Sequence, residues 1–473
     1  MYRCALLTLT LIVSGFAAPT EDLVNDLPGL NFQPAFEHYS GYVNVSSTKF
    51  FHYWFTKAYS NPDTSPVILW LNGGPGCSSV VGLIEELGPF HVKDNGQTVY
   101  ENPYSWNHVG NVIFLESPAG VGFSYASDSD PLASDETVAE DNYQALLYFF
   151  KYKFPEYRDN DFYITGESYS GIYIPMLAVK VAAKPNFPAF KGVAIGNGIY
   201  SFPLNYNTMV PLFYYHGLVR NSLYSDVATT CCNGNTYNCD YYTLLHSETE
   251  CSDKIKLLLQ QGADLDPYNL YSTCYLDNGA TSQRNFIRNA LFRKSNLKGL
   301  DNSIGSGLPL CAQSNNTEIY LNRADVRNAL HIPDSVGHWT ECSNDVALYY
   351  QYTHNDVSKE FHTLLGNIRI LTYNGDVDTV CNLAMNMEFV ASLGLSIKDG
   401  SENSAEWYYN YETPRVAGFV TKYTQNLDFV TVRGSGHFVP QDKPREALQL
   451  IYNFIHNRDY SLPIPFQVRR AVL

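Results

Sequence analysis

The sequence "DFYITGESYSG", residues 161–171, indicates the fold class more directly than any other part of the chain. An apolar run ends at Gly166, Ser168 follows on a tight turn of small residues, and a helical pattern begins directly after it. A strand, a sharp turn carrying a serine and a helix together form the nucleophile elbow of α/β-hydrolases. Ser170 replaces the last glycine of the strict G-x-S-x-G pattern, and Gly171 comes one place later. The turn alone is therefore a moderate signal, and Ser168 needs an acid and a histidine as partners.

Both partners follow in the chain order of α/β-hydrolases, which is nucleophile, acid, histidine. The segment "YNGDVDTVCN" (373–382) places Asp376 and Asp378 where an apolar run ends, and "RGSGHFVP" (433–440) places His437 on a glycine-rich turn. In such a triad the histidine takes the proton of the serine, and the acid fixes the tautomer of the histidine. The spacing leaves both acids open as the third member.

A glycine-rich loop earlier in the chain, "WLNGGPGCSS" (70–79), is suited to an oxyanion hole. Attack on a carbonyl creates an oxyanion, which preorganised N–H groups stabilise by about 3 kcal/mol each. We expect one donor to be the backbone N–H of Tyr169 and the other to come from this loop, where glycines allow close approach. The pattern is not a phosphate-binding loop, because no Lys-Ser/Thr pair follows the glycines.

Short apolar runs of the kind that buried strands show recur along the chain, and helical patterns lie between some of them. The expected strands are residues 66–72, 111–117, 161–168, 191–198, 367–376 and 427–437, and the expected helices include 135–153 and 169–183. An alternating segment at 39–58 predicts a hairpin at a sheet edge. This pattern predicts an α/β fold, with a mostly parallel central sheet and helices on both faces.

The alternation stops after Gly198, and we interpret residues 200–310 as an inserted cap. That region holds six cysteines (231, 232, 239, 251, 274 and 311, the last at its boundary) and a basic run at 284–300. Disulfides suit a segment that cannot build a full core of its own. The core would then comprise residues 18–199 and 311–473, after a secretory signal peptide at 1–17 whose apolar run is too short to span a bilayer.

Charge and cysteines restrict the class of protein further. A formal net charge of −16 argues against nucleic acid or anionic membranes as partners. Of ten cysteines Cys4 leaves with the signal peptide, and the remaining nine predict four disulfides and one free thiol in an oxidising compartment. Their spacing is not that of a zinc site, and we expect no metal and no cofactor. The sequons at Asn44 and Asn315 agree with secretion.

Six motifs taken together resemble the serine carboxypeptidase family. They are "WLNGGPGCSS", "ESPAGVGFSY" (116–125), "TGESYSG", "IGNG" (195–198), "NGDVD" and "GSGHFVP", and the resemblance runs from about residue 27 to the C-terminus. It implies an α/β-hydrolase fold with Asp378 as the catalytic acid and Asp376 as a structural residue. It also implies Gly74 as the oxyanion donor and Cys381 as a free thiol at the active site. The implied disulfides are Cys77–Cys342, Cys231–Cys251, Cys232–Cys239 and Cys274–Cys311.

The resemblance gives Glu167, directly before the nucleophile, a role in substrate binding. An exopeptidase must recognise a free C-terminal carboxylate, and these motifs offer no lysine or arginine for the task. The family uses hydrogen bonds instead, and the matching groups are Asn72, the N–H of Gly73, Glu86 and Glu167. Two neighbouring carboxyls cannot both ionise cheaply, so one keeps a proton that it can donate to the substrate. This predicts peptidase activity at acid pH.

Two further positions concern the departing amino acid. Trp70 matches a residue of its pocket, and Phe438 departs from the residues common after the histidine in relatives, which favours hydrophobic over basic residues. The expected function is a serine carboxypeptidase that acts through an acyl-enzyme on Ser168, in the lysosome or outside the cell. Alternatives are an acyltransferase of the same family, many of which carry Asp in place of Glu167, and an added role as a protective partner of lysosomal glycosidases. A homodimer is a further expectation, and a generic lipase gives no reason for Asn72, Glu86 and Glu167 together.

Overall fold

A computed structural model describes residues 18–468, apart from 129–131, 185–186, 188, 262–264, 274–314, 399–403 and 410–412. The expected signal peptide at 1–17, the basic run at 284–300 and the implied pair Cys274–Cys311 lie outside the described residues. Among the described residues, none of the helices is long and apolar enough to cross a membrane.

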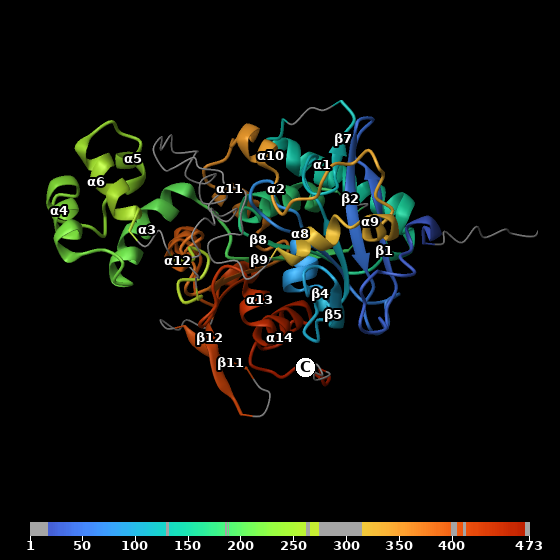
Figure 1. Ribbon diagram of the computed structural model, residues 1–473. Helices are drawn as coiled ribbons and strands as arrows, with labels where there is room; N and C mark the ends of the chain where they lie inside the picture. Colours follow the sequence, from blue (N-terminus) through green and yellow to red (C-terminus); the bar gives the residue numbers. More distant parts are fainter. Residues whose placement is uncertain are drawn as a thin grey trace, which may run out of the picture.

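An 11-stranded sheet forms the centre of the molecule (Figure 1), in the order β1-β2-β6-β3-β8-β9-β10-β13-β12-β11 with β7 paired to β2. The strands are β1 (His38–Asn44), β2 (Lys49–Thr56), β3 (Val67–Leu71), β6 (Asn111–Leu115), β7 (Tyr125–Ala126), β8 (Phe162–Glu167), β9 (Phe190–Gly196), β10 (Arg369–Gly375), β11 (Ala405–Tyr409), β12 (Arg415–Lys422) and β13 (Leu427–Val432). The strands from β6 to β13 in this order are parallel, and antiparallel strands extend both edges. The predicted mostly parallel sheet and the hairpin at its edge are confirmed.

Strand β3 shows why the parallel strands are continuously apolar. All five of its residues are buried, and successive side chains point to opposite faces. Val67, Leu69 and Leu71 belong to one core, whereas Ile68 and Trp70 belong to a second core on the other face. Each face is covered by helices, so neither face of the strand can be polar.

Different helices cover the two faces. The first core includes residues of α1 (Asp135–Tyr148), α2 (Ser170–Ala182), α11 (Ser358–Leu364) and α12 (Leu383–Ser392), and the second includes residues of α14 (Pro444–Ile455). Helix α1 begins where Ser134 accepts a hydrogen bond from the N–H of Thr137, which satisfies one of the free donors at the helix start. Helices on both faces of the sheet, as predicted, place this fold in the α/β-hydrolase class.

The insertion between β9 and β10 begins with a group of helices that extends away from the sheet (Figure 1). These are α3 (Phe202–Tyr215), α4 (Asn221–Cys231), α5 (Tyr241–Leu245) and α6 (Glu250–Leu259). Disulfides join Cys231 to Cys251 and Cys232 to Cys239 within the group. The chain then returns through α8 (Asn316–Leu321), α9 (Ala324–Ala329) and α10 (Asn344–Tyr349), and Cys342 bonds Cys77. These are three of the four pairs that the resemblance implies.

Several elements have no counterpart in the expectation from the sequence. They are a separate two-stranded sheet of β4 (Phe90–Lys93) and β5 (Thr98–Glu101), the edge strands β11 and β12, helices α13 (Val439–Asp442) and α14, and the short turns η1 (Thr20–Asp22), η2 (Gly82–Glu86), η3 (Trp106–His108), η4 (Phe149–Lys153), η5 (Pro155–Tyr157) and η6 (Thr424–Asn426). The expected helix at 135–153 is also divided, because α1 ends at Tyr148 and η4 continues as a wider turn. Edge strands are partly exposed, so their sequences carry fewer apolar residues than buried strands do.

Candidate active site

Ser168 lies at the turn between β8 and α2, where the backbone adopts a rare conformation. Its φ is +74°, a value that residues other than glycine seldom adopt. Strain of this kind holds the serine of a nucleophile elbow at the tip of its turn. A Cβ on Gly73 would lie 2.3 Å from the backbone nitrogen of Tyr169 and 2.7 Å from Cβ of Ser168. The glycine loop can therefore touch the elbow only because position 73 has no side chain.

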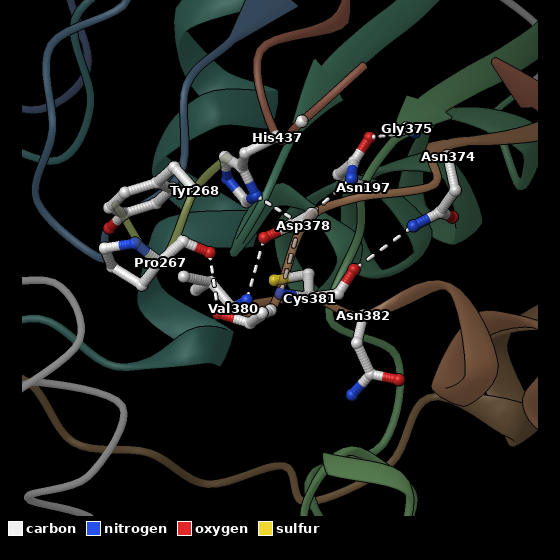
Figure 2. Close-up of polar contacts among 12 residues, drawn as sticks. Asn197, Pro267, Tyr268, Asn374, Gly375, Asp378, Val380, Cys381, Asn382 and His437 are labelled. Atoms are coloured by element: carbon white, nitrogen blue, oxygen red, sulfur yellow. Dashed lines mark hydrogen bonds and ion pairs between the residues drawn. The ribbon is translucent and has the colours of Figure 1, made fainter. Parts of the chain in front are cut away.

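The order of the parallel strands brings the acid and the histidine to the same end of the sheet as Ser168. Strands β8, β9, β10 and β13 are consecutive, and Asp378 and His437 follow the last two of them. Nδ1 of His437 lies 2.7 Å from Oδ2 of Asp378, and both side chains are buried (Figure 2). With Nδ1–H donated to the carboxylate, Nε2 is the nitrogen that can accept a proton.

Asp378, and not Asp376, makes this contact. Oδ1 of Asp376 accepts the backbone N–H of Gly434 at 2.6 Å, and burial raises the pKa of that carboxyl. Asp376 thus connects the end of β10 to the turn after β13. The spacing in the sequence did not distinguish the two acids, but their contacts do, because only Asp378 touches His437.

Asn197 is a residue of this site whose role the sequence did not reveal, although it lies within the motif "IGNG". Its Nδ2 donates to Oδ2 of Asp378 at 2.9 Å, and its Oδ1 accepts the N–H of Gly375 at 2.9 Å (Figure 2). The N–H groups of Val380 and Cys381 complete the bonding of the carboxylate at 2.7 and 3.2 Å. Asp378 is therefore held in one orientation by four donors, of which His437 is one.

The backbone N–H groups of Gly74 and Tyr169 lie in the two segments expected to form the oxyanion hole. Within the described residues, neither group donates a hydrogen bond to another backbone or side-chain acceptor. The hydroxyl of Tyr169 donates to Oδ1 of Asp135 at 2.7 Å, which holds the ring of Tyr169 in place. Asp135 is fully buried at the start of α1 and also accepts from the hydroxyl of Tyr350 at 2.9 Å.

A second polar group, built from Asn72, Glu86 and Glu167, lies beside the elbow. Nδ2 of Asn72 donates to Oε1 of Glu86 at 3.0 Å and to Oε1 of Glu167 at 2.9 Å. Glu86 comes from η2, a single wide turn that follows the glycine loop, and such turns are frequent at functional sites. Trp70 donates its indole N–H to Oδ1 of Asn72 at 2.7 Å and so fixes which way the amide points.

The two carboxyls of this group both have raised pKa values. Burial raises the pKa of Glu86 to about 7. Burial and then the charge of Glu86 raise the pKa of Glu167 well above its usual value. Oε2 of Glu86 and Oε2 of Glu167 are buried and have no hydrogen-bond partner among the described residues. The group therefore holds a proton at acid pH and keeps two unpaired oxygen atoms.

The residues expected around the departing amino acid differ in how deeply they are buried. Trp70 is completely buried and contacts the site through Asn72, whereas Phe438 is half-buried and stacks on Tyr268 with ring centroids 5.3 Å apart. Tyr268 also lies edge-on to the ring of His437 at 4.9 Å. It belongs to the insertion, far from the motifs in sequence, and no pattern in the sequence indicated it. Cys381 is a free, buried thiol, and burial raises its pKa well above the usual value.

Three potential metal ligands lie together at this site. Ligand atoms of Asp378, Cys381 and His437 lie within 4.8 Å of one another. Two of them are already joined by the contact between His437 and Asp378, and the thiol has a raised pKa that disfavours the thiolate a metal needs.

Both sequon asparagines lie elsewhere on the surface, Asn44 at the end of β1 and Asn315 directly before α8.

Comparison with known proteins agrees with this geometry. Residues 28–457 match the model of the serine carboxypeptidase family. A serine carboxypeptidase of Caenorhabditis elegans is 53% identical over 95% of this chain and 96% of its own length. The lysosomal protective protein of Mus musculus is 40% identical over 94% of this chain and 95% of its own length. A crystal structure of a prohormone-processing carboxypeptidase from Saccharomyces cerevisiae shares the fold, with a TM-score of 0.72 at 24% identity over 93% of this chain and 96% of that one. The chain therefore belongs to the serine carboxypeptidase family and is a hydrolase that acts on the C-termini of peptides.

Proposed function

We propose that Ser168 is the nucleophile that attacks the carbonyl carbon of the last peptide bond. As the new C–O bond forms, Nε2 of His437 takes the proton of the serine, and Asp378 stabilises the resulting imidazolium. The same proton then goes to the departing amine when the peptide bond breaks, which leaves an acyl-enzyme on Ser168. Water, deprotonated by His437, hydrolyses the acyl-enzyme and restores the serine. The contact between His437 and Asp378 supports these roles.

The negative charge on the carbonyl oxygen is stabilised by the N–H groups of Gly74 and Tyr169. Both groups are free of other hydrogen bonds in the described structure. Donors fixed before the reaction act most strongly, because they need no rearrangement as charge develops.

The group of Asn72, Glu86 and Glu167, with the N–H of Gly73, binds the free carboxylate of the substrate. The observation that carries this proposal is the pair of buried carboxyls next to the nucleophile, with raised pKa values and two oxygen atoms that have no hydrogen-bond partner in the described structure. A protonated carboxyl donates a hydrogen bond to the substrate carboxylate, whereas an ionised one repels it. Binding of free-acid substrates should therefore weaken as the pair ionises, and the enzyme should work best at acid pH.

Matched substrates test this reading. Blocked dipeptides with a free C-terminus and with an amidated C-terminus are compared by kcat/KM across pH, for the wild type and for Glu167→Gln. The wild type should lose activity on the free acid more steeply than on the amide as pH rises, and Glu167→Gln should flatten that difference. Parallel profiles for the two substrates in the wild type would refute carboxylate recognition by the pair.

Labelling separates this question from the identity of the nucleophile. A serine-directed fluorophosphonate should label the wild type, but neither Ser168→Ala nor His437→Ala. Labelling without carboxylate selectivity would retain the triad and favour the alternative of an acyltransferase or another acyl-group hydrolase.

Phe438 and Tyr268 are proposed to line the pocket of the departing residue and to favour hydrophobic side chains. Their stacked rings present an apolar surface next to His437, and an apolar wall gives a basic side chain no ionic partner.

We place the protein in the secretory pathway, with the lysosome as its destination. The acid optimum expected from the carboxyl pair and the similarity to a protein named lysosomal protective protein support this placement. A homodimer and association with lysosomal glycosidases stay predictions. Light scattering after size-exclusion chromatography, with and without a purified glycosidase, tests both.

A further inference from the structure

The motif "ESPAGVGFSY" has no part in the mechanism above, yet it surrounds a fully buried carboxylate, that of Glu116, just after β6. Oε1 accepts hydrogen bonds from the hydroxyl of Ser78 and, at 2.8 Å, from the indole N–H of Trp339. Oε2 accepts the backbone N–H of Phe123 at 2.8 Å and lies 2.9 Å from Nδ1 of His52. Four groups thus converge on one fully buried side chain.

Counting hydrogen atoms shows that Oε1 of Glu116 carries no proton. The N–H groups of Trp339 and Phe123 can only donate. The hydroxyl of Ser78 has two described contacts: its oxygen accepts the N–H of Val80 at 3.1 Å, and its hydrogen goes to Oε1 of Glu116. A proton on Oε1 would leave the hydroxyl hydrogen of Ser78 without an acceptor. A buried anion of this kind is stable only with donors and an opposite charge around it.

The ring of His52 lies beside this carboxylate and must carry a hydrogen on Nε2. Ser40 has one hydroxyl hydrogen, and it lies 2.7 Å from the carbonyl oxygen of Leu330, which can only accept. Nε2 of His52, 2.9 Å from the same hydroxyl oxygen, must then be the donor. One hydrogen lies between Nδ1 of His52 and Oε2 of Glu116. The three other donors on the carboxylate favour its ionised form, which places this hydrogen on Nδ1 and makes the ring an imidazolium.

The rest of the motif makes room for this pair. Gly122 has a φ of +55°, and a Cβ there would lie 1.8 Å from Oε1 of Glu116. The hydroxyl of Ser124 accepts the backbone N–H of His52 at 2.8 Å and donates to the carbonyl of Glu116 at 2.7 Å. The hydroxyl of Tyr42 donates a hydrogen bond to the carbonyl of Phe123 at 3.2 Å. Burial together with the charge of Glu116 raises the pKa of Tyr42.

Ser78 connects the ion pair to the proposed oxyanion hole. It belongs to the glycine loop, in which the N–H of Cys77 donates to the carbonyl of Gly73 at 3.1 Å. The backbone N–H of Ser78 is also bonded, to the carbonyl of Glu341 at 2.8 Å. The side-chain contact with Glu116 therefore ties the far end of this loop to the residue that follows β6.

We propose that Glu116 is a positioning residue for catalysis, kept ionised by an imidazolium on His52, and that through Ser78 it fixes the glycine loop that supplies the oxyanion donor. The proposal rests on the proposed roles of Gly74 and Ser168. Loss of the contact between Ser78 and Glu116 should lower the rate of the chemical step and leave substrate binding nearly unchanged, because the substrate carboxylate is bound elsewhere.

The protonation states can be measured without any activity. Neutron diffraction from deuterated crystals of the whole chain should show deuterium on both Nδ1 and Nε2 of His52 and none on Glu116. Deuterium on only one ring nitrogen, or on Glu116, would overturn the ion pair.

The positioning role is tested by Ser78→Ala with Trp339→Phe as the matched control. Both variants remove one donor from Oε1 of Glu116, but only the first removes it from the glycine loop. Ser78→Ala should lower kcat about tenfold, less than the 10²–10³-fold loss typical when an oxyanion donor is removed outright. Its KM should stay within about twofold, while kcat of Trp339→Phe should stay near that of the wild type even if its Tm falls. Glu116→Gln would bring its amide N–H group against other donors and is expected to misfold, so it is not the deciding variant.

Fluorophosphonate labelling completes the test. Slower labelling of Ser78→Ala, in step with its kcat, supports positioning of the oxyanion loop. Unchanged kcat in Ser78→Ala, or an equal loss in both variants, overturns the proposal while Ser168 remains the nucleophile. Absence of labelling in the wild type would instead refute the proposed function itself.

Discussion

Replacing Glu86 by Gln should change how the stability of this protein depends on pH. Burial raises the pKa of Glu86 from 4.5 to about 7 in the folded chain. Between these values the folded chain binds more protons than the unfolded chain, so the free energy of unfolding falls as pH rises through the window. A difference of about 2.5 pH units, at about 1.4 kcal/mol per unit, corresponds to a loss of about 3 kcal/mol. Gln does not titrate, so Glu86→Gln should escape this part of the loss.

The measurement is urea unfolding of the wild type and the variant at several values of pH from about 4.5 to about 7.5. The stability of Glu86→Gln relative to the wild type should increase by about 3 kcal/mol across this range. Glu248→Gln is the control, because Glu248 is exposed and lies in the insertion, and its difference from the wild type should not change with pH. A constant difference between Glu86→Gln and the wild type would refute the argument, because Glu86 would then titrate alike in the folded and unfolded chains.

Three further predictions concern the catalytic acid, the specificity and the insertion. Asp378→Asn should lower kcat by about 10⁴-fold, because it loses the acceptor that holds the histidine tautomer. Asp376→Asn should lower kcat less than about tenfold. The opposite ranking of the two variants in a steady-state assay would mean that the acid is wrongly assigned. Phe438→Ala should raise KM about tenfold or more for substrates that end in Leu and should change KM little for those that end in Lys, and equal changes for both would exclude Phe438 from the pocket. Limited trypsin digestion should cut in the basic run at 284–300 and raise activity in parallel with cleavage, and full activity before cleavage would argue against maturation at this segment.

Much of the central sheet was predictable from the sequence because its strands are buried on both faces. Strands β3, β6 and β8 read as continuous apolar runs, and no polar face interrupts the pattern. The edge strands β11 and β12 are half-exposed and mix polar with apolar residues, so no run marks them. Helix α14 was detectable, since Ala447, Leu448, Ile451 and Phe454 follow the helical spacing of a buried face.

The residues of the site also differ in how far the sequence could predict them. Ser168 and His437 could be predicted because tight turns of small residues mark them in the chain. The choice between Asp376 and Asp378 needed a resemblance or a structure, because both acids follow the same strand and differ only in what they face. Asn197 and Tyr268 act through contacts with residues far away in sequence. The motif "IGNG" marks the place of Asn197 without revealing its contact, and nothing in the local sequence marks Tyr268.

The bond between Cys77 and Cys342 joins the oxyanion loop to the chain after the insertion, 265 positions later in the sequence. Every residue of the cap at 200–310 lies on the ring that this bond closes. A protease that cuts the chain once anywhere inside this ring therefore opens it without releasing a piece. The product would be a two-chain enzyme of unchanged mass on a non-reducing gel, and two fragments would appear only after reduction. The nucleophile at 168 and the histidine at 437 would then belong to different polypeptides, and the bond between Cys77 and Cys342 would keep these two chains covalently connected wherever the cap at 200–310 is cut.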